Sequence, residues 1–166
     1  MSIIRVKAVK SALTATFLLC ILTACGSIKL APEYDKAIVD GLTSVNQKMM
    51  QFFAAASSGT TAATYDNREN TYNELIGSID ALAIQTEARP LPTNDITSLF
   101  RSGSTAESSD NGKSSVIALK KISETVTKMR DTDKKQGVTA TEVAAFKGQA
   151  VIYLDQALTY ESFLKR

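Results

Sequence analysis

Apolar residues recur at alternating spacings of three and four along four segments of this chain, which is the period of an amphipathic α-helix. The pattern predicts helices over residues 32–56, 65–88, 115–130 and 139–166. No stretch of useful length alternates apolar and polar residues with the period of two that marks a half-buried strand. Four amphipathic helices bury their apolar stripes most simply side by side. The sequence therefore predicts an all-α, antiparallel four-helix bundle.

Local signals are expected to set several helix ends. The polar run at 57–61 ends the first helix. Pro90 and Pro92 stop the second, because proline lacks a backbone donor and restricts the residue before it. Thr139 and Glu142 have the spacing of a capping box, which opens the fourth helix.

A long polar segment lies between the second and third predicted helices. Residues 95–100 carry enough apolar side chains for one short helical turn, whereas residues 101–114 are largely Ser, Gly, Asp and Asn. Because such a composition buries almost no apolar surface, it predicts a solvated, mobile loop. A second polar link is predicted over residues 131–138.

The beginning of the chain differs in composition from the rest. Residues 1–10 contain Arg5, Lys7 and Lys10 and no acid, and residues 12–22 form an apolar run interrupted by two threonines. A basic segment followed by a short apolar one is typical of a signal peptide. The apolar run is too short to cross roughly 30 Å of hydrocarbon, which takes about 20 residues. A retained transmembrane helix is therefore not expected.

The apolar run ends in Leu22-Thr23-Ala24-Cys25, which resembles the lipobox of bacterial lipoprotein precursors. The resemblance implies that residues 1–24 are a lipoprotein signal peptide and that Cys25 carries lipid on its sulfur and its amino group. Two or three acyl chains, at about 0.8 kcal/mol per buried CH₂, hold a protein at a membrane. The resemblance also implies that Gly26, in place of an aspartate, favours the periplasmic face of the outer membrane. An ordinary secretory signal followed by a cysteine is the alternative.

Removal of the leader would leave residues 25–31 as a lipidated cysteine with a short tether and residues 32–166 as a single domain. It would also leave 16 of the 19 basic residues against 17 acidic ones, so nucleic acid is not an expected partner. The chain contains no histidine, which excludes Ser-His and Cys-His catalysis and the usual zinc and copper sites. No catalytic residue, metal site or cofactor is therefore predicted.

One face of the fourth predicted helix lacks an obvious place in the core. At about 100° per residue, a stripe opposite the core face contains Ile152, Gln156, Thr159 and Phe163. Two large apolar side chains there are explained most simply if the segment at 96–100 folds over them. The alternative is a surface that binds a partner.

Charge is also unevenly distributed along the chain. Residues 33–87 hold an excess of acids, whereas residues 113–135 hold an excess of bases. Neighbouring helices with complementary flanks explain this simply. The alternative is a basic face, built from Lys120, Lys121 and Lys128, that turns toward lipid phosphates.

Two further features concern the bundle interior. Arg68 shares a face with the apolar residues of the second predicted helix, so we expect its stem to pack at an end of the bundle with its head in water. Tyr65, Tyr72 and Tyr153 are expected to converge at one end of the core, either as core residues with a wet tip or around a small pocket.

Taken together, these patterns predict a lipid-anchored cell-envelope protein without enzymatic activity that binds another envelope protein through an exposed helix face. The tether Gly26–Ala31 allows at most roughly 25 Å between Cys25 and Pro32, so the bundle is expected close to the membrane. The alternatives are a bundle that binds a small ligand or lipid in an interior aromatic cavity and, third, a histidine-free hydrolase.

Overall fold

The computed structural model describes residues 31–90 and 114–165, which belong to one compact unit. Within these ranges the chain forms no strand and four α-helices: α2 (Lys36–Ala55), α3 (Asp66–Glu87), α5 (Ser114–Gln136) and α6 (Ala140–Phe163). A 3₁₀ turn, η1 (Ala62–Thr64), precedes α3. The prediction of an all-α four-helix bundle is confirmed.

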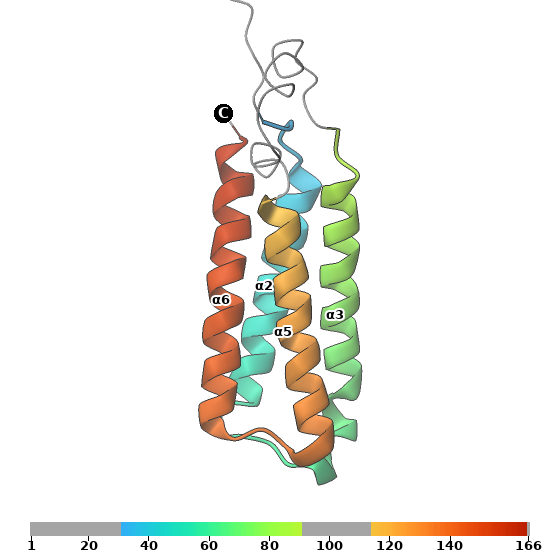
Figure 1. Ribbon diagram of the computed structural model, residues 1–166, viewed down its shortest axis with the longest axis vertical. Coiled ribbons are helices and arrows are strands. Elements are labelled where there is room, and N and C mark those ends of the chain that lie inside the picture. Colours follow the sequence, from blue (N-terminus) through green and yellow to red (C-terminus); the bar gives the residue numbers. More distant parts are fainter. Residues whose placement is uncertain (1–30, 91–113, 166) are drawn as a thin grey trace, which may run out of the picture. The chain divides into compact units, whose positions relative to one another are not determined.

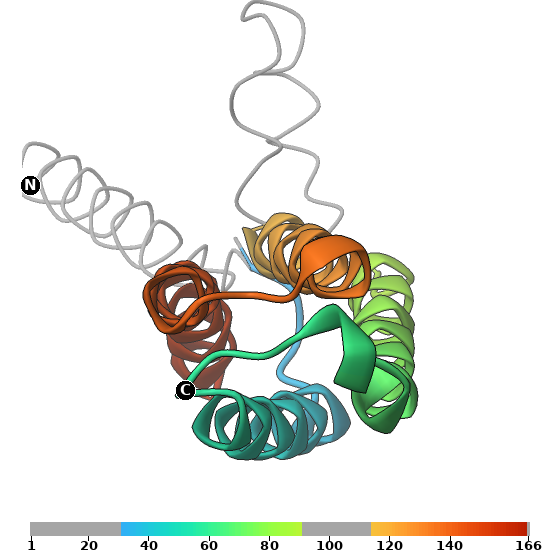
Figure 2. The same ribbon diagram turned by 90° about the horizontal axis from the view of Figure 1, so that it is seen from below.

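Each helix packs against two of the others. Both α2 and α5 contact α3 and α6, so α2 and α5 lie on one diagonal of a square (Figure 2). Helices that follow one another in the sequence run in opposite directions (Figure 1). We call the end that holds the connections at 56–65 and 137–139 the loop end. The opposite end, where α2 begins and α6 ends, is the terminal end.

The apolar stripes of the helices meet along the axis of the bundle, as their spacing predicts. The buried residues of α2 are Ile38, Leu42, Val45, Met49, Phe52 and Phe53. Phe52 packs edge-on against Tyr72 of α3 with 4.7 Å between ring centroids. Such a ring pair contributes about 1 kcal/mol beyond the area that it buries. The aromatic side chains near the loop end therefore fill the core.

One helix start differs from the prediction and another agrees with it. The first helix begins at Lys36 instead of residue 32, because the side chain of Asp35 accepts a hydrogen bond from the backbone of Ala37 and caps the helix there. At the fourth helix the capping box is present, with reciprocal bonds between Thr139 and Glu142. A side-chain cap thus marks the start of both helices.

The predicted polar link over 131–138 is wrong for most of its length, because α5 continues to Gln136. Asp133 follows Val126 and Met129 on the inward face of α5, and it is fully buried. Its carboxylate is bound by Arg68 of α3. The helix can therefore continue through a charged residue at a core position, because a side chain of opposite charge on the neighbouring helix binds it.

Several predictions fall outside the described residues: the leader, Cys25, the helical turn at 95–100 and the loop over 101–113. Ser114, which we assigned to that loop, is the first residue of α5. Among the helices of the described ranges, none has the length and apolar content needed to cross a bilayer.

Candidate functional site

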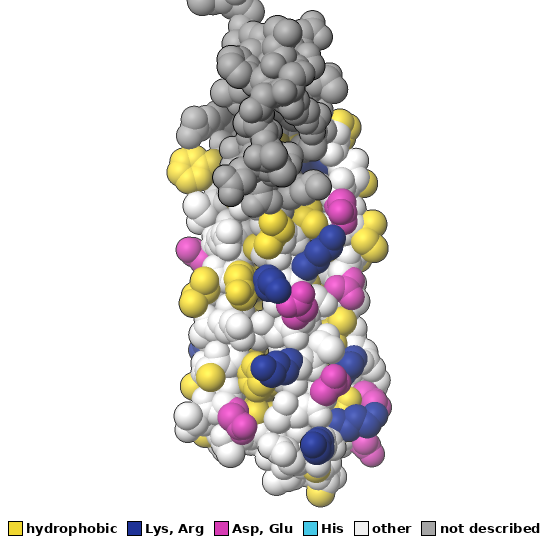
Figure 3. Space-filling model, in the orientation of Figure 1, with side chains coloured by type: hydrophobic (Ala, Val, Ile, Leu, Met, Phe, Trp, Pro, Cys, Tyr) yellow, Lys and Arg dark blue, Asp and Glu magenta, His cyan; other side chains and the backbone are white. Residues whose placement is uncertain are grey.

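The outward face of α6 carries the surface predicted from the sequence. The core-facing residues of this helix are Val143, Ala150, Leu154, Ala157 and Glu161. On the opposite face Ile152 is 67% exposed and Phe163 60% exposed, and Gln156 and Thr159 are exposed as well. In Figure 3 hydrophobic side chains recur along the α6 side, whereas most charged side chains gather over α5 and α3. α6 thus carries exposed apolar side chains among polar ones on its outer face.

Next to this stripe lie Val151, which is also exposed, and Gly148, whose outward side is empty. A Cβ atom built on Gly148 would meet nothing within 4 Å. Glycine inside a helix costs about 1 kcal/mol relative to alanine. No contact within the described part of the chain requires glycine at this position.

Charged residues are scarce on α6. Apart from Glu142 in the capping box and the buried Glu161, the helix carries only Lys147 and Asp155. Both are exposed, and neither forms an ion pair with any described residue. By contrast, exposed charges on the other helices are often paired, as Lys48 is with Glu74.

The three lysines of the predicted basic face are partly neutralised. Lys120 reaches Glu87 of α3 at 3.1 Å, and Lys121 reaches Glu124 at 2.8 Å. Glu124 therefore pairs with Lys121 within α5. The contact between Lys120 and Glu87 supports complementary flanks between α3 and α5, although such an exposed pair contributes at most about 1 kcal/mol.

At the loop end, a buried ion pair joins α3 to α5. Arg68 donates through Nε and Nη2 to the two carboxylate oxygens of Asp133, at 2.8 and 2.9 Å. Thr60 and Tyr72 also donate to this carboxylate, at 2.6 and 3.2 Å. Burial alone would raise the pKa of Asp133, but these bonds outweigh it and hold the pKa below its ordinary 3.8.

The same ion pair changes the interpretation of Arg68. It lies at an end of the bundle as predicted, but its head binds Asp133 and the carbonyl of Thr61 rather than water. Its side chain is only 18% exposed. Burial and the adjacent carboxylate also raise the pKa of Tyr72 well above its ordinary value. At neutral pH these shifts keep Asp133 and Arg68 charged and Tyr72 neutral.

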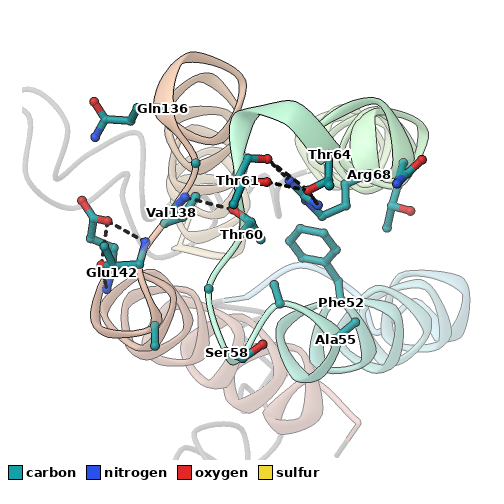
Figure 4. Close-up of a pocket in the computed structure, with 17 residues that line it drawn as sticks. Phe52, Ala55, Ser58, Thr60, Thr61, Thr64, Arg68, Gln136, Val138 and Glu142 are labelled. Carbon is teal, nitrogen blue, oxygen red and sulfur yellow. Dashed lines mark hydrogen bonds between the residues drawn. The ribbon is translucent and has the colours of Figure 1, made fainter.

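Hydrogen bonds join the two connections at the loop end, residues 56–65 and 137–139, to each other. The backbone of Thr60 donates to the carbonyl of Val138, and the backbone of Val138 donates to the hydroxyl of Thr60 (Figure 4). Gly59 and Gly137 both have positive φ, and a Cβ on Gly137 would lie 2.5 Å from the carbonyl oxygen of Thr60. Only glycine permits so close an approach of two backbones.

An open groove of about 1020 Å³ runs along the loop end beside these connections (Figure 4). Its lining is mostly hydroxyl and amide side chains with a few apolar ones, including Phe52, Ser58, Thr60, Thr61, Thr64, Asn67, Arg68, Thr71, Gln136 and Thr139. Arg68 already uses three nitrogens in bonds within the protein. Glu142, the other charged residue of the lining, is bonded to Thr139, so the groove offers mainly neutral polar groups.

The terminal end holds a second buried ion pair. Arg89 donates through Nη1 and Nη2 to Glu161 of α6, at 2.7 and 2.8 Å. The hydrogen bonds and charge of Glu161 raise the pKa of Arg89, and burial raises that of Tyr160. The Nε atom of Arg89, the hydroxyl of Ser115 and the hydroxyl of Tyr160 are buried and have no hydrogen-bond partner among the described residues.

The structure brings together two of the three tyrosines predicted to converge. The rings of Tyr65 and Tyr72 stack with centroids 6.3 Å apart, but Tyr153 joins no ring pair in the described part of the chain. The fully buried carboxylates, Asp133 and Glu161, lie at opposite ends of the bundle and are each bound by an arginine. No group of three or more metal-ligating side chains occurs among the described residues.

Sequence reasoning missed Asp133, Arg89 and Glu161. A signal for the two acids exists, because each continues an apolar stripe of its helix: Asp133 follows Val126 and Met129, and Glu161 follows Leu154 and Ala157. An acid at a core position requires a buried cation opposite it.

No protein-family model matches this chain, and neither a curated protein nor a solved structure matches it.

Proposed function

We propose that this protein is a lipid-anchored component of the bacterial cell envelope that binds another envelope protein through the outer face of α6. The anchor is Cys25, and the periplasmic face of the outer membrane is the location that the residue after it favours. The bundle serves as a rigid support for that face and has no enzymatic activity in this proposal.

The observation that carries the proposal is the exposure of large apolar side chains, above all Ile152, on the outer face of α6. Large apolar side chains on a helix are usually covered by other parts of the protein. Within the described residues, however, nothing covers Ile152, and the adjacent Gly148 leaves room for a close neighbour. The surface is therefore suited to a protein partner with a helix or strand of low charge.

The tether supports a partner in or near the same membrane. Cys25 is at most roughly 25 Å from Pro32, and α2 begins four residues later. Confinement to one leaflet raises the effective concentration of a neighbour, so a modest surface is sufficient for binding.

A photo-reactive residue placed at Gln156 tests the proposal in intact cells. We expect a defined crosslinked adduct, and we expect Ile152→Ser to abolish it without lowering the thermal unfolding temperature. The matched control is a photo-reactive residue at Gln85, which is likewise exposed on α3 and should give no adduct. Adducts of the same size from both positions would refute a specific role for α6.

The anchor is tested separately by mass spectrometry of the N-terminal peptide. We expect acylation at Cys25 and loss of membrane association in Cys25→Ser. An unmodified thiol at Cys25 in protein from the aqueous fraction would refute the anchor while leaving the role of α6 open.

Binding of a small ligand is the second candidate function. The observation that favours it is the groove at the loop end, with its lining of hydroxyl and amide groups, rather than an interior aromatic cavity. Native mass spectrometry of the purified protein tests it. A bound small molecule lost in Thr64→Val, with the fold retained, would favour this candidate over the first.

A further inference from the structure

Lys147 and Asp155 form a symmetrical pair about the middle of α6. They have opposite charges and lie about two helical turns apart, with Val151 midway between them. Projection at about 100° per residue puts both on the same flank of the Ile152 stripe. Neither has an ion-pair partner in the described part of the chain.

We propose that the outer face of α6 pairs in antiparallel orientation with the same face of a second copy of this chain. A two-fold axis perpendicular to the helix, passing near Val151, places Lys147 of each copy opposite Asp155 of the other. The two unpaired charges thus become two ion pairs from a single self-complementary surface, as an isologous interface requires.

The apolar side chains fit the same register. With the axis near Val151, Val151 and Ile152 meet their own copies at the centre of the interface. Ile152 of one copy then lies beside Gly148 of the other, where the structure leaves open space. A small residue opposite a large one lets two helices approach closely. The interface therefore explains why position 148 holds a glycine, which no contact within the described part of a single chain requires.

The opposite flank of the stripe is compatible with this arrangement. It carries Gln149 and Gln156, which are exposed and uncharged. Their midpoint lies close to Val151, so the same two-fold axis brings Gln149 of one copy near Gln156 of the other. Their amide groups can donate to and accept from each other.

Charge pairing favours the antiparallel orientation over the parallel one. In a parallel two-fold pair, the flank that carries Lys147 and Asp155 would face the glutamine flank of the other copy, so neither charge would gain an ion-pair partner. In the antiparallel pair the two Pro32 residues lie at opposite ends of the dimer. Because each tether is short, the dimer would lie with its long axis along the membrane.

This inference rests on the proposed function for its location and for the use of α6, and it identifies the partner as a second copy. Self-association itself does not require the lipid. The two ideas can therefore fail independently, and the tests below separate them.

A charge exchange tests the register. We expect Lys147→Asp and Asp155→Lys each to weaken self-association of the purified full-length protein by about tenfold or more, because each creates two like-charge contacts. The double variant restores both pairs with reversed polarity and should dimerise like the parent. Sedimentation of a dilution series measures all four proteins. Unchanged dimerisation in the single variants, or no recovery in the double variant, would overturn the proposal.

Crosslinking in isolated membranes provides a second measurement. With a short bis-maleimide, we expect Ile152→Cys to give a species of twice the chain mass. Ile84→Cys is the matched control, since Ile84 is 68% exposed on α3 and Ile152 is 67% exposed on α6. Equal yields from both variants would refute pairing through α6.

The parent chain in the same experiment tests whether Cys25 is acylated. If Cys25 is acylated, the parent has no reactive thiol after loss of the leader and gives no crosslink. A crosslink in the parent would refute the anchor alone. An adduct of Ile152→Cys with a different mass only would support the proposed function and refute pairing with a second copy.

Discussion

The loop end and the terminal end each bury one arginine–carboxylate pair, but the two pairs differ in how completely their polar atoms are bonded. Asp133 accepts four hydrogen bonds, from Arg68, Thr60 and Tyr72. From the described residues Glu161 accepts two, both from Arg89. Within the same residues, Nε of Arg89 and the hydroxyls of Ser115 and Tyr160 have no hydrogen-bond partner, whereas no buried polar side-chain atom at the loop end lacks one.

This difference shows what a buried ion pair does in each place. At the loop end, Asp133 ties α3 and α5 to the connection that holds Thr60, so the network fixes how the helices are joined. At the terminal end, Arg89 and Glu161 join the segment that follows α3 to α6, and buried groups there remain unbonded by any described residue, which costs free energy. The loop end is therefore expected to be the more rigid and the more sensitive to substitution.

The largest expected effect separates the two carboxylates. Asp133→Ala leaves four donors unpaired and should lower the free energy of unfolding by about 5 kcal/mol, whereas Glu161→Ala should lower it by about 3 kcal/mol. Urea unfolding of the purified variants measures both. Equal losses would show that the two additional hydrogen bonds at Asp133 contribute nothing to the free energy of unfolding.

A smaller effect tests the contact between the two connections. Gly137→Ala should lower stability by roughly 2 kcal/mol, since the new methyl group would meet the carbonyl oxygen of Thr60 at a positive φ. Gly77→Ala is the control, because Gly77 lies inside α3 with open space around it. There the same change should raise stability by about 1 kcal/mol. Losses of similar size in both variants would contradict the contact.

The buried tyrosine hydroxyls sharpen the comparison further. Tyr72→Phe removes a bond to the Asp133 carboxylate and should cost about 1 kcal/mol. Tyr160→Phe removes a buried hydroxyl without a partner and should leave stability unchanged or slightly higher. Thermal unfolding of the two single variants gives the comparison, and a larger loss for Tyr160→Phe would reverse our assignment of the less complete end.

The smallest expected change concerns Glu142, at the loop end. Bonds from the backbone and hydroxyl of Thr139 hold its pKa below the ordinary 4.5. A carboxylate with a lowered folded pKa stabilises fully above its ordinary pKa and loses that contribution as the pH falls through the folded value. Parent and Glu142→Gln should therefore differ slightly in unfolding at pH 7 and converge in acid. A constant difference at all pH values would contradict this.

Much of the fold follows from local patterns. Spacing of apolar residues predicts the four helices, and Thr139 with Glu142 predicts the start of the fourth. The outward position of Ile152 also follows from helix geometry, because a projection needs only the residue number and the core face. The end of α5 does not follow, since polar residues such as Asp133 favour a link in the local pattern and are retained in the helix by a contact with α3.

By itself, the sequence determined the helices, their apolar stripes, the outward stripe on α6 and a leader that resembles those of lipoproteins, because these depend on composition and on periods of a few residues. The tertiary structure alone decided that Arg68 meets Asp133 and that Arg89 meets Glu161. It also decided that Gly137 and Thr60 touch. These partners lie far apart along the chain, and only the packing of helices against one another selects which buried charge meets which.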